Sequence, residues 1–323
     1  IRNKTIILRK MNNRFNTRQY LSILWIFGLI LFSSCKNADA VSSNTNPKNE
    51  ISINKIIEHD GLQREYILYI PESYTGNDPV PLVFNFHGYT QYADDYMLYA
   101  DFRPIADTAK FILVYPQGTL HNGLTHWNVD GSWTQGSTVD DVGFTEAMID
   151  TLTFEYNIDQ SRIYATGLSN GGYMSFQLAC QLNDKFAAIA SVAATMIPTT
   201  FKSCSPQHPT PILQMHGTND PLVPYTGNII SVSVNDVLQY WIDYNNCNKN
   251  PTTTNLPHNL NTINGSTAQL IVYDGGDNHI RVEHFKINGG GHEWPGSSGN
   301  MDINASDEIW KFFSNYDING LIE

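Results

Sequence analysis

The stretch that decides the fold is YATGLSNGGYMS, residues 164–175. A β-branched and aromatic run at its start predicts a short buried strand, and apolar residues recur every four positions after Gly172, as on one face of a helix. Ser169 is therefore expected at a sharp turn from strand to helix. Gly167 and Gly171 flank it because a side chain there would collide with the neighbouring strand and helix. The pattern G-x-S-x-G at such a turn is typical of a nucleophile elbow, a strained turn that exposes a serine hydroxyl.

Apolar strands alternate with helical segments along the chain. The strands are expected at 51–57, 64–70, 81–86, 111–116, 162–166, 187–194, 211–216, 268–273 and 281–287, and helices before residue 110, at 140–156, after Gly172, at 232–246 and at 306–316. This alternation predicts an α/β fold, with a mostly parallel central sheet and helices on both faces. In such sheets functional groups collect beyond the carboxyl ends of the strands.

Two candidate partners of Ser169 follow other predicted strands. Asp220 lies in HGTNDPLVPY and His292 lies in NGGGHEWPG, each just past a strand end. A serine hydroxyl is a poor nucleophile until a base takes its proton, and imidazole titrates near neutral pH. A carboxylate behind the imidazole fixes its tautomer and supports the imidazolium. We therefore interpret the three residues as nucleophile, acid and base; the alternative for Asp220 is a turn former beside Pro221.

The reaction also requires two N–H donors for the developing oxyanion. Asn170, at the start of the predicted helix, would supply one of them. The loop HGYTQ would supply the other, which we assign to Tyr89, with Thr90 as the alternative. His87 and His216 each precede a glycine at a strand end, and we interpret both as structural groups near the site.

Residues 1–35 are predicted to be an export signal. Two arginines precede an apolar run of about a dozen residues, which is short of the ~20 needed to span a bilayer. The small residues before Cys35 resemble a bacterial lipobox, so Cys35 is predicted to carry lipid; the alternative is an uncleaved or plainly secreted signal. Residues 36–50 are polar and predict a tether to a single catalytic domain at 51–323. The protein is thus expected at the cell envelope, periplasmic or on the cell surface, or outside the cell.

The charge balance argues against nucleic acid as a partner. Without residues 1–34, 13 basic residues remain against 31 acidic ones, a formal charge of −18. The same charge argues against an anionic membrane surface as a partner, so the only membrane contact expected is the lipid anchor. The composition fits a neutral or weakly charged substrate.

Three cysteines follow Cys35 in the sequence. An exported chain permits disulfides. The sequence contains no C-x-x-C pair, so it does not indicate a zinc site. Cys204 precedes one predicted strand, and Cys247 ends the helix that returns beside that strand. We therefore predict a Cys204–Cys247 disulfide, with Cys180 in the core.

Five segments together resemble the group of polyhydroxybutyrate depolymerases and feruloyl esterases, serine esterases of carbohydrate esterase family 1. They are FNFHGYTQ, TVDDVGF, YATGLSNGGYMSFQLAC, HGTNDPLVPY and GGGHEWPG, and the likeness runs from about 80 to 300. The resemblance implies an α/β-hydrolase fold, ester hydrolysis through an acyl-enzyme, and no cofactor or metal. It places nucleophile, acid and base on the three residues assigned above and suggests that Trp294 borders the acyl pocket. The group commonly has a cysteine where this chain has Tyr89.

The substrate is less well defined by the sequence. The loop 117–138 carries Trp127 and Trp133, which are expected either to overhang the site and contact substrate, or to lie in the core. Feruloyl or acetyl esters of plant polysaccharide are the expected substrates, with polyhydroxyalkanoate or short aliphatic esters as alternatives. A non-catalytic surface binding protein and a peptidase on the same triad are the other functional classes.

Overall fold

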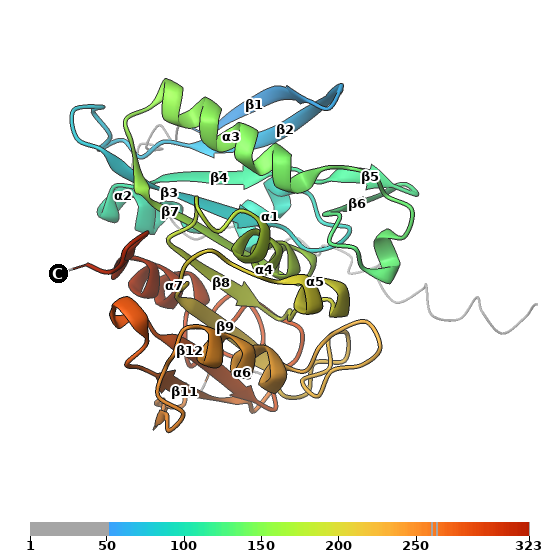
Figure 1. The fold of residues 1–323 in the computed structure, drawn as a ribbon, viewed down its shortest axis with the longest axis vertical. Coiled ribbons are helices and arrows are strands. Elements are labelled where there is room, and N and C mark those ends of the chain that lie inside the picture. Colours follow the sequence, from blue (N-terminus) through green and yellow to red (C-terminus); the bar gives the residue numbers. More distant parts are fainter. Residues whose placement is uncertain (1–51, 260, 263, 323) are drawn as a thin grey trace, which may run out of the picture. The chain divides into compact units, whose positions relative to one another are not determined.

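The computed structural model describes residues 52–259, 261–262 and 264–322, and ten strands of these residues form one sheet (Figure 1). In sheet order they are β1 (Ser52–His59), β2 (Leu62–Tyr69), β4 (Ile112–Pro116), β3 (Val80–Phe86), β7 (Ile158–Leu168), β8 (Ala188–Val192), β9 (Ile212–Gly217), β12 (Val282–Asn288), β11 (Thr267–Tyr273) and β10 (Thr252–Asn255). The six strands from β4 to β12 run parallel, and the strands beyond them on each side pair antiparallel.

Helices cover both faces of this sheet, as the sequence predicts. The face turned to the viewer in Figure 1 carries α3 (Asp141–Glu155), α4 (Asn170–Gln181), the short α5 (Pro198–Ser203) and α6 (Val234–Tyr244). The opposite face carries α1 (Ala93–Tyr99), α2 (Arg103–Ala109) and α7 (Ala305–Phe313). Smaller elements are β5 (Thr119–His121), β6 (Leu124–His126), β13 (Tyr316–Asp317), β14 (Gly320–Leu321) and two short 3₁₀ turns, η1 (Ser132–Thr134) and η2 (Asp277–His279).

The central strands separate two hydrophobic cores. Strand β3 is buried at all seven positions because helices cover both of its faces. Leu82 and Phe84 face the core under α3, α4 and α6, whereas Val83 faces the core under α1, α2 and α7. Each such side chain stabilises the fold by about 1.5–3 kcal/mol when it leaves water. This rigid central sheet fixes the strand ends from which the candidate site is built.

The predicted α/β-hydrolase fold is confirmed, and most predicted elements lie within a few residues of their observed bounds. The first hairpin turns at Asp60 and Gly61, both with positive φ, as expected for a tight turn. The sequence did not predict α5 or the edge strand β10, which are short and lack a clear period. The predicted export signal, lipidated Cys35 and tether lie outside the described residues.

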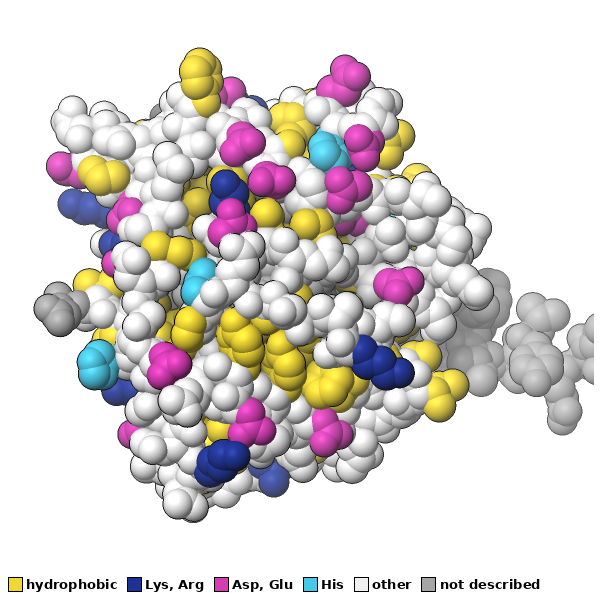
Figure 2. All heavy atoms as spheres, viewed as in Figure 1, with side chains coloured by type: hydrophobic (Ala, Val, Ile, Leu, Met, Phe, Trp, Pro, Cys, Tyr) yellow, Lys and Arg dark blue, Asp and Glu magenta, His cyan; other side chains and the backbone are white. Residues whose placement is uncertain are grey.

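The surface of the viewed face is mixed. Figure 2 shows hydrophobic side chains gathered in a band between α4 and α6, and acidic side chains scattered over the rest of that face. None of the described helices has both the length and the apolar character to cross a membrane.

Candidate active site

Ser169 lies at the predicted turn between β7 and α4. Strand β7 ends at Leu168 and the helix begins at Asn170, so the serine is the single residue that connects them. Its φ of 54° and ψ of −118° are strained for a residue with a side chain. The elbow geometry is therefore confirmed.

The glycines around Ser169 allow close approach of three backbone segments. A Cβ on Gly171 would lie 1.9 Å from the carbonyl oxygen of Phe86, and a Cβ on Gly167 would lie 2.6 Å from the same oxygen. A Cβ on Gly172 would lie 2.7 Å from the Cβ of Ala194. Only glycine fits at these positions, so the physical reason inferred for the motif is also confirmed.

Asp220 and His292, 72 residues apart in sequence, are in contact. The Nδ1 atom of His292 lies 2.8 Å from Oδ2 of Asp220. The loops that follow β9 and β12 bring them together, because these strands are parallel neighbours and their carboxyl ends meet at one edge of the sheet. The Asp220 side chain is buried, whereas the His292 side chain is 14% exposed.

Ser169 and His292 line one cavity of about 500 Å³. The serine hydroxyl makes no hydrogen bond to the His292 ring, although both residues are described. Such a bond is often long or absent before substrate binds. The arrangement thus has the acid–base pair assembled and the hydroxyl in the same cavity.

The environment of Asp220 favours its ionised form. Burial alone would raise the pKa of the carboxyl, but the hydrogen bond from His292 and the charge of its ring hold the pKa below its usual value. The N–H groups of Leu222 and Val223 donate to Oδ1 at 2.8 and 2.9 Å and act in the same direction. A charged carboxylate therefore faces Nδ1 of the imidazole.

His216 lies next to Asp220 and supports its loop as a structural group. Its Nε2 atom lies 2.8 Å from the carbonyl oxygen of Val223 and 3.6 Å from Oδ2 of Asp220. The amide of Gln214 lies 3.1 Å from its Nδ1 atom, so the ring donates from Nε2 and accepts at Nδ1. Burial lowers the pKa of His216, which keeps the ring neutral beside the acid.

The two candidate oxyanion donors differ in how they are held. Asn170 is the first residue of α4, where backbone N–H groups have no acceptor within the helix. The N–H of Thr90 donates to the carbonyl oxygen of Thr125 at 2.9 Å, so it is already used. The N–H of Tyr89 has no hydrogen-bond partner among the described residues. This difference favours Tyr89 over Thr90 as the second donor.

His87 fixes the peptide unit that carries the Tyr89 N–H. The N–H of Gly118 donates to its Nε2 atom at 2.9 Å, so Nδ1 carries the proton and donates to the carbonyl oxygen of Gly88 at 2.7 Å. The Gly88–Tyr89 peptide is trans, so its N–H points away from that carbonyl. Burial lowers the pKa of His87 to about 4, which keeps the ring in this neutral form.

The structure corrects both predicted tryptophan contacts. Trp294 is fully buried against Tyr96 and Phe102 in the core and does not line the cavity. Trp127 is also fully buried, and its Nε1–H donates to the carbonyl oxygen of His87 at 2.9 Å. A large aromatic side chain near a strand end can pack in the core or line a pocket. Trp127 and Trp294 both pack in the core.

Other side chains line the cavity instead. The aromatic and aliphatic ones are Tyr89, Tyr99, Trp133, Leu168, Tyr173, Leu222, Val223 and Ile230. The rings of Trp133 and Tyr173 lie 5.4 Å apart, and the Tyr173 hydroxyl is hydrogen-bonded to the Ser231 hydroxyl. Tyr173 follows Ser169 by four residues, and residues four apart lie on the same side of a helix. This spacing could have identified Tyr173 as a wall of the cavity from the sequence.

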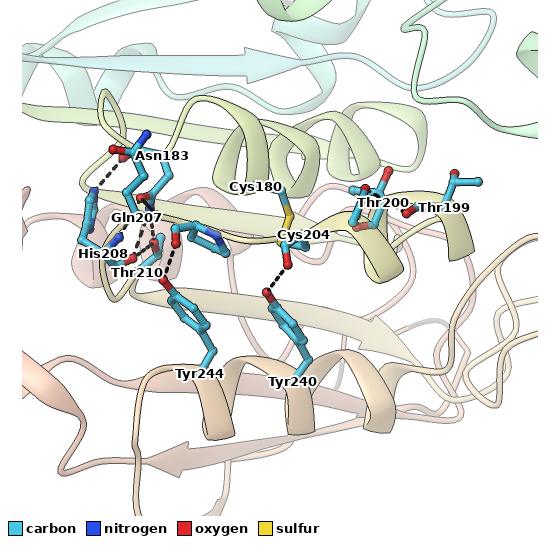
Figure 3. Close-up of a disulfide and its surroundings, with 12 residues drawn as sticks. Cys180, Asn183, Thr199, Thr200, Cys204, Gln207, His208, Thr210, Tyr240 and Tyr244 are labelled. Carbon is cyan, nitrogen blue, oxygen red and sulfur yellow. Dashed lines mark hydrogen bonds between the residues drawn. A yellow bond between two sulfur atoms is a disulfide. The ribbon is translucent and has the colours of Figure 1, made fainter.

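The predicted Cys204–Cys247 disulfide is wrong. Cys204 is bonded to Cys180, with the Cα atoms 4.9 Å apart, and Cys247 is a buried free cysteine (Figure 3). The unpredicted helix α5 is the reason, because it carries Cys204 back over α4. One thiol remains unpaired, as expected, but it is Cys247, whose Sγ packs against Gly276.

Two aspartates at the start of α3 have different roles. Asp140 caps the helix by accepting the N–H of Gly143 at 2.8 Å. Asp141 is buried and accepts a hydrogen bond from the Arg64 guanidinium at 2.6 Å. Asp140 also lies 3.2 Å from His59, and these two with Asp60 are the one group of potential metal ligands among the described residues. None of the three lines the cavity.

Comparison with protein families and curated proteins agrees with this architecture. The phospholipase/carboxylesterase family matches residues 124–258. The chain is 29% identical over 270 residues to the bifunctional acetylxylan esterase/xylanase XynS20E of Neocallimastix patriciarum, covering 83% of this chain and 36% of that protein. It is 30% identical over 240 residues to feruloyl esterase B of Piromyces equi, covering 71% and 42%. The chain thus spans less than half the length of these two relatives.

A polyester depolymerase and a solved esterase structure are also similar to this chain. The poly(3-hydroxyalkanoate) depolymerase C of Paucimonas lemoignei is 26% identical over 326 residues, covering 90% of this chain and 71% of that protein. Among solved structures, the acetyl xylan esterase from Aspergillus awamori superposes with a TM-score of 0.55 at 15% identity, covering 78% of this chain and 94% of that one. This structural likeness supports the shared fold.

Proposed function

The chain is an α/β-hydrolase related to feruloyl esterases, acetylxylan esterases and polyhydroxyalkanoate depolymerases, and we propose that it is a serine esterase that hydrolyses carboxylic esters. The contact between Asp220 and His292 in the loops after β9 and β12, next to an elbow serine in the same cavity, carries this proposal. Two of these side chains are in contact and the third lines the same cavity, beyond the carboxyl ends of parallel strands, which supports this chemistry.

In the proposed reaction, Ser169 Oγ attacks the ester carbonyl while His292 Nε2 takes its proton. The new Oγ–C bond places negative charge on the carbonyl oxygen, which the N–H groups of Tyr89 and Asn170 stabilise. The bond to the alcohol oxygen then breaks, and the imidazolium returns the proton to that oxygen. Water, activated by the same imidazole, attacks the acyl-enzyme and releases the acid. Asp220 supports the imidazolium in both halves.

Feruloyl or acetyl esters of plant polysaccharide are the substrates we propose. The partly exposed Trp133 lines the cavity, with its ring 5.4 Å from that of Tyr173, and offers an aromatic surface on which an aromatic acyl group can pack. The alternative, a polyhydroxyalkanoate or short aliphatic ester, is supported by Leu222 and Ile230 in the same cavity. Net charge favours neither nucleic acid nor an anionic surface as a partner.

We place the protein outside the cytoplasm. The Cys180–Cys204 disulfide supports an exported location, because disulfides persist in oxidising compartments. A lipid anchor on Cys35, and hence a periplasmic or cell-surface position, is the finer proposal. Mass spectrometry of the mature protein tests it, because acylation adds a defined mass to the peptide that begins with Cys35.

The experiment that tests the function compares two serine variants from the same helix region. Ser169→Ala should lose at least about 10³-fold in kcat on p-nitrophenyl acetate. Ser175→Ala is the matched control, since its hydroxyl donates to the Gly171 carbonyl at 3.0 Å and does not line the cavity. Equal background hydrolysis by wild type and Ser169→Ala would contradict the proposal and favour a non-catalytic binding protein. Methyl ferulate, acetylated xylan, hydroxybutyrate oligomers and peptide anilides then separate esterase from peptidase.

A further inference from the structure

A second cavity of about 420 Å³ adjoins the first one. We call it the second cavity; its lining residues are Asn128, Asp130, Gly131, Ser132, Thr134, Gln135, Gly136, Ser137, Ile197, Pro198, Thr199, Ile229 and Ile230. Ile230 lines both cavities. Trp133, which lines the first cavity, lies in sequence between Ser132 and Thr134, which line the second. The two cavities are therefore neighbours around these two side chains.

The second cavity has two walls of different chemistry. The loop 128–137 forms a polar wall, and the side chains of Asp130, Ser132 and Gln135 are exposed and have no hydrogen-bond partner among the described residues. Aliphatic side chains at the start of α5 and at Ile229 and Ile230 form the other wall. A sugar ring matches this division, because it presents C–H groups on its faces and hydroxyl groups at its edge.

Asp130 distinguishes a sugar from a polyester. It is the one charged residue of the lining, and an ionised carboxylate can only accept hydrogen bonds. A sugar hydroxyl can donate to it, whereas a polyhydroxyalkanoate chain offers carbonyl and ester oxygens, which are acceptors. The absence of Lys and Arg from the lining also disfavours an anionic ligand.

The polar wall is held in place from beneath. The N–H of Asn128 donates to Oδ2 of Asp141 at 2.7 Å, and the other oxygen of that carboxylate accepts from Arg64. Both partners of this ion pair are buried, with side chains 1% and 0% exposed. This buried carboxylate therefore fixes the backbone at Asn128, the first residue of the polar wall.

The aliphatic wall is fastened as well. Thr199 lies on α5, whose end is joined to α4 by the Cys180–Cys204 disulfide (Figure 3). The Tyr240 hydroxyl donates to the Cys204 carbonyl oxygen at 3.0 Å and ties the same point to α6. The α5 part of the aliphatic wall and the Asn128 end of the polar wall are therefore held before a ligand binds, which lowers the entropy cost of binding.

From these observations we propose that the second cavity binds a neutral glycosyl unit of the ester substrate, at least one ring away from the reacting carbonyl. This inference rests on the proposed esterase function and deepens it, because it selects glycosyl esters over polyesters. The residues that would recognise the sugar hydroxyls are Asp130, Ser132 and Gln135.

A comparison of two ferulate esters tests this. The double variant Ser132→Ala/Gln135→Ala should lower kcat/KM about ten-fold on a feruloylated xylo-oligosaccharide of three or more rings, and less than two-fold on methyl ferulate. Gln63→Ala, an exposed glutamine on β2 outside both cavities, is the matched control and should change neither value. Equal losses on the two esters, or a selective loss on hydroxybutyrate oligomers, would overturn the proposal.

A binding measurement separates this inference from the esterase function. In the Ser169→Ala background, titration calorimetry with unesterified xylo-oligosaccharide should give a Kd that the double variant raises about ten-fold. If the wild type hydrolyses no ester but this difference in Kd is seen, the second cavity stands and the esterase proposal fails. If the wild type is an active esterase and the double variant leaves the Kd unchanged, the glycosyl-site proposal is contradicted while the esterase proposal is not.

Discussion

Oδ2 of Asp220 lies 2.8 Å from Nδ1 of His292, while Oδ1 of the same carboxylate accepts hydrogen bonds from the N–H groups of Leu222 and Val223. The backbone therefore holds the carboxylate in place independently of the imidazole. Asp220→Asn keeps an acceptor for these N–H groups but removes the charge and presents an amide to Nδ1. We expect kcat on methyl ferulate to fall roughly 10³–10⁴-fold, because the wrong tautomer of His292 is favoured.

The unfolding temperature serves as the control for this variant. Since the Oδ1 contacts can be kept, it should stay within a few degrees of wild type. A kcat within ten-fold of wild type in a folded Asp220→Asn protein would mean that Asp220 is only the turn former that its position beside Pro221 also allows.

The sequence predicts the structure best at positions where the geometry allows only one type of residue or one arrangement. Gly167 and Gly171 are required by contacts shorter than a Cβ tolerates, so their spacing around Ser169 predicts the elbow directly. Asp220 and His292 follow strands, and the parallel sheet brings strand ends to one edge, so their meeting could be predicted without coordinates.

Side-chain direction and short elements could not be predicted in the same way. Trp127 and Trp294 lie close in sequence to site residues, but their rings turn into the core, and this depends on packing that no local pattern encodes. The disulfide was mispredicted because six-residue α5 has no recognisable period, yet it sets where Cys204 lies. The choice between Tyr89 and Thr90 rested on one contact, with Thr125, from a distant loop.

His87 offers a test of the proposed oxyanion role of the Gly88–Tyr89 peptide. His87→Ala removes the donor that holds the Gly88 carbonyl, so the Tyr89 N–H loses its fixed direction. We expect kcat to fall about 10²-fold with little change in KM, since the contact is made mainly in the transition state. His87→Asn, which places an amide donor near the Nδ1 position, should recover part of that loss.

His208 provides a matched control for this experiment. Its Nδ1 atom also lies 2.8 Å from the carbonyl oxygen of the following residue, Pro209, and it does not line the cavity. His208→Ala should leave kcat within two-fold. A KM increase without loss of kcat in His87→Ala would contradict the positioning role and indicate a general distortion of the cavity.

The disulfide should contribute substantially to stability. Cys180 and Cys204 close a loop with a sequence separation of 24. Loop-closure entropy predicts that the double variant Cys180→Ala/Cys204→Ala loses about 3 kcal/mol of unfolding free energy, measured by urea denaturation. Cys247→Ala is the control that keeps the bond, and its non-reducing peptide map should still contain the 180–204 cross-link. A 204–247 cross-linked peptide in the wild type would contradict the pairing.

Buried histidines predict a loss of stability in mild acid. Burial lowers the pKa of His87 to about 4 and of His284 to about 3, so each stays neutral in the folded chain well below the pH at which it takes up a proton when unfolded. Their contribution to the unfolding free energy is complete above about pH 6.5, the pKa of an unfolded histidine. It is lost as the pH falls towards the pKa values that the two rings have in the folded chain. Together they should lower the unfolding free energy by roughly 3–4 kcal/mol between pH 7 and pH 5.

Urea denaturation across this pH range measures the effect, and two variants locate it. His284 accepts from the Tyr225 hydroxyl and contacts the Gln214 carbonyl, so His284→Gln keeps polar groups there but cannot titrate. The variant should reduce the change in unfolding free energy between pH 7 and pH 5 by roughly 2 kcal/mol. Exposed His279 is the control, and His279→Asn should leave the dependence unchanged, since asparagine tolerates the positive φ at that position. A stability that stays constant from pH 7 to pH 5 would show that the two rings are already protonated, or solvated, in the folded protein.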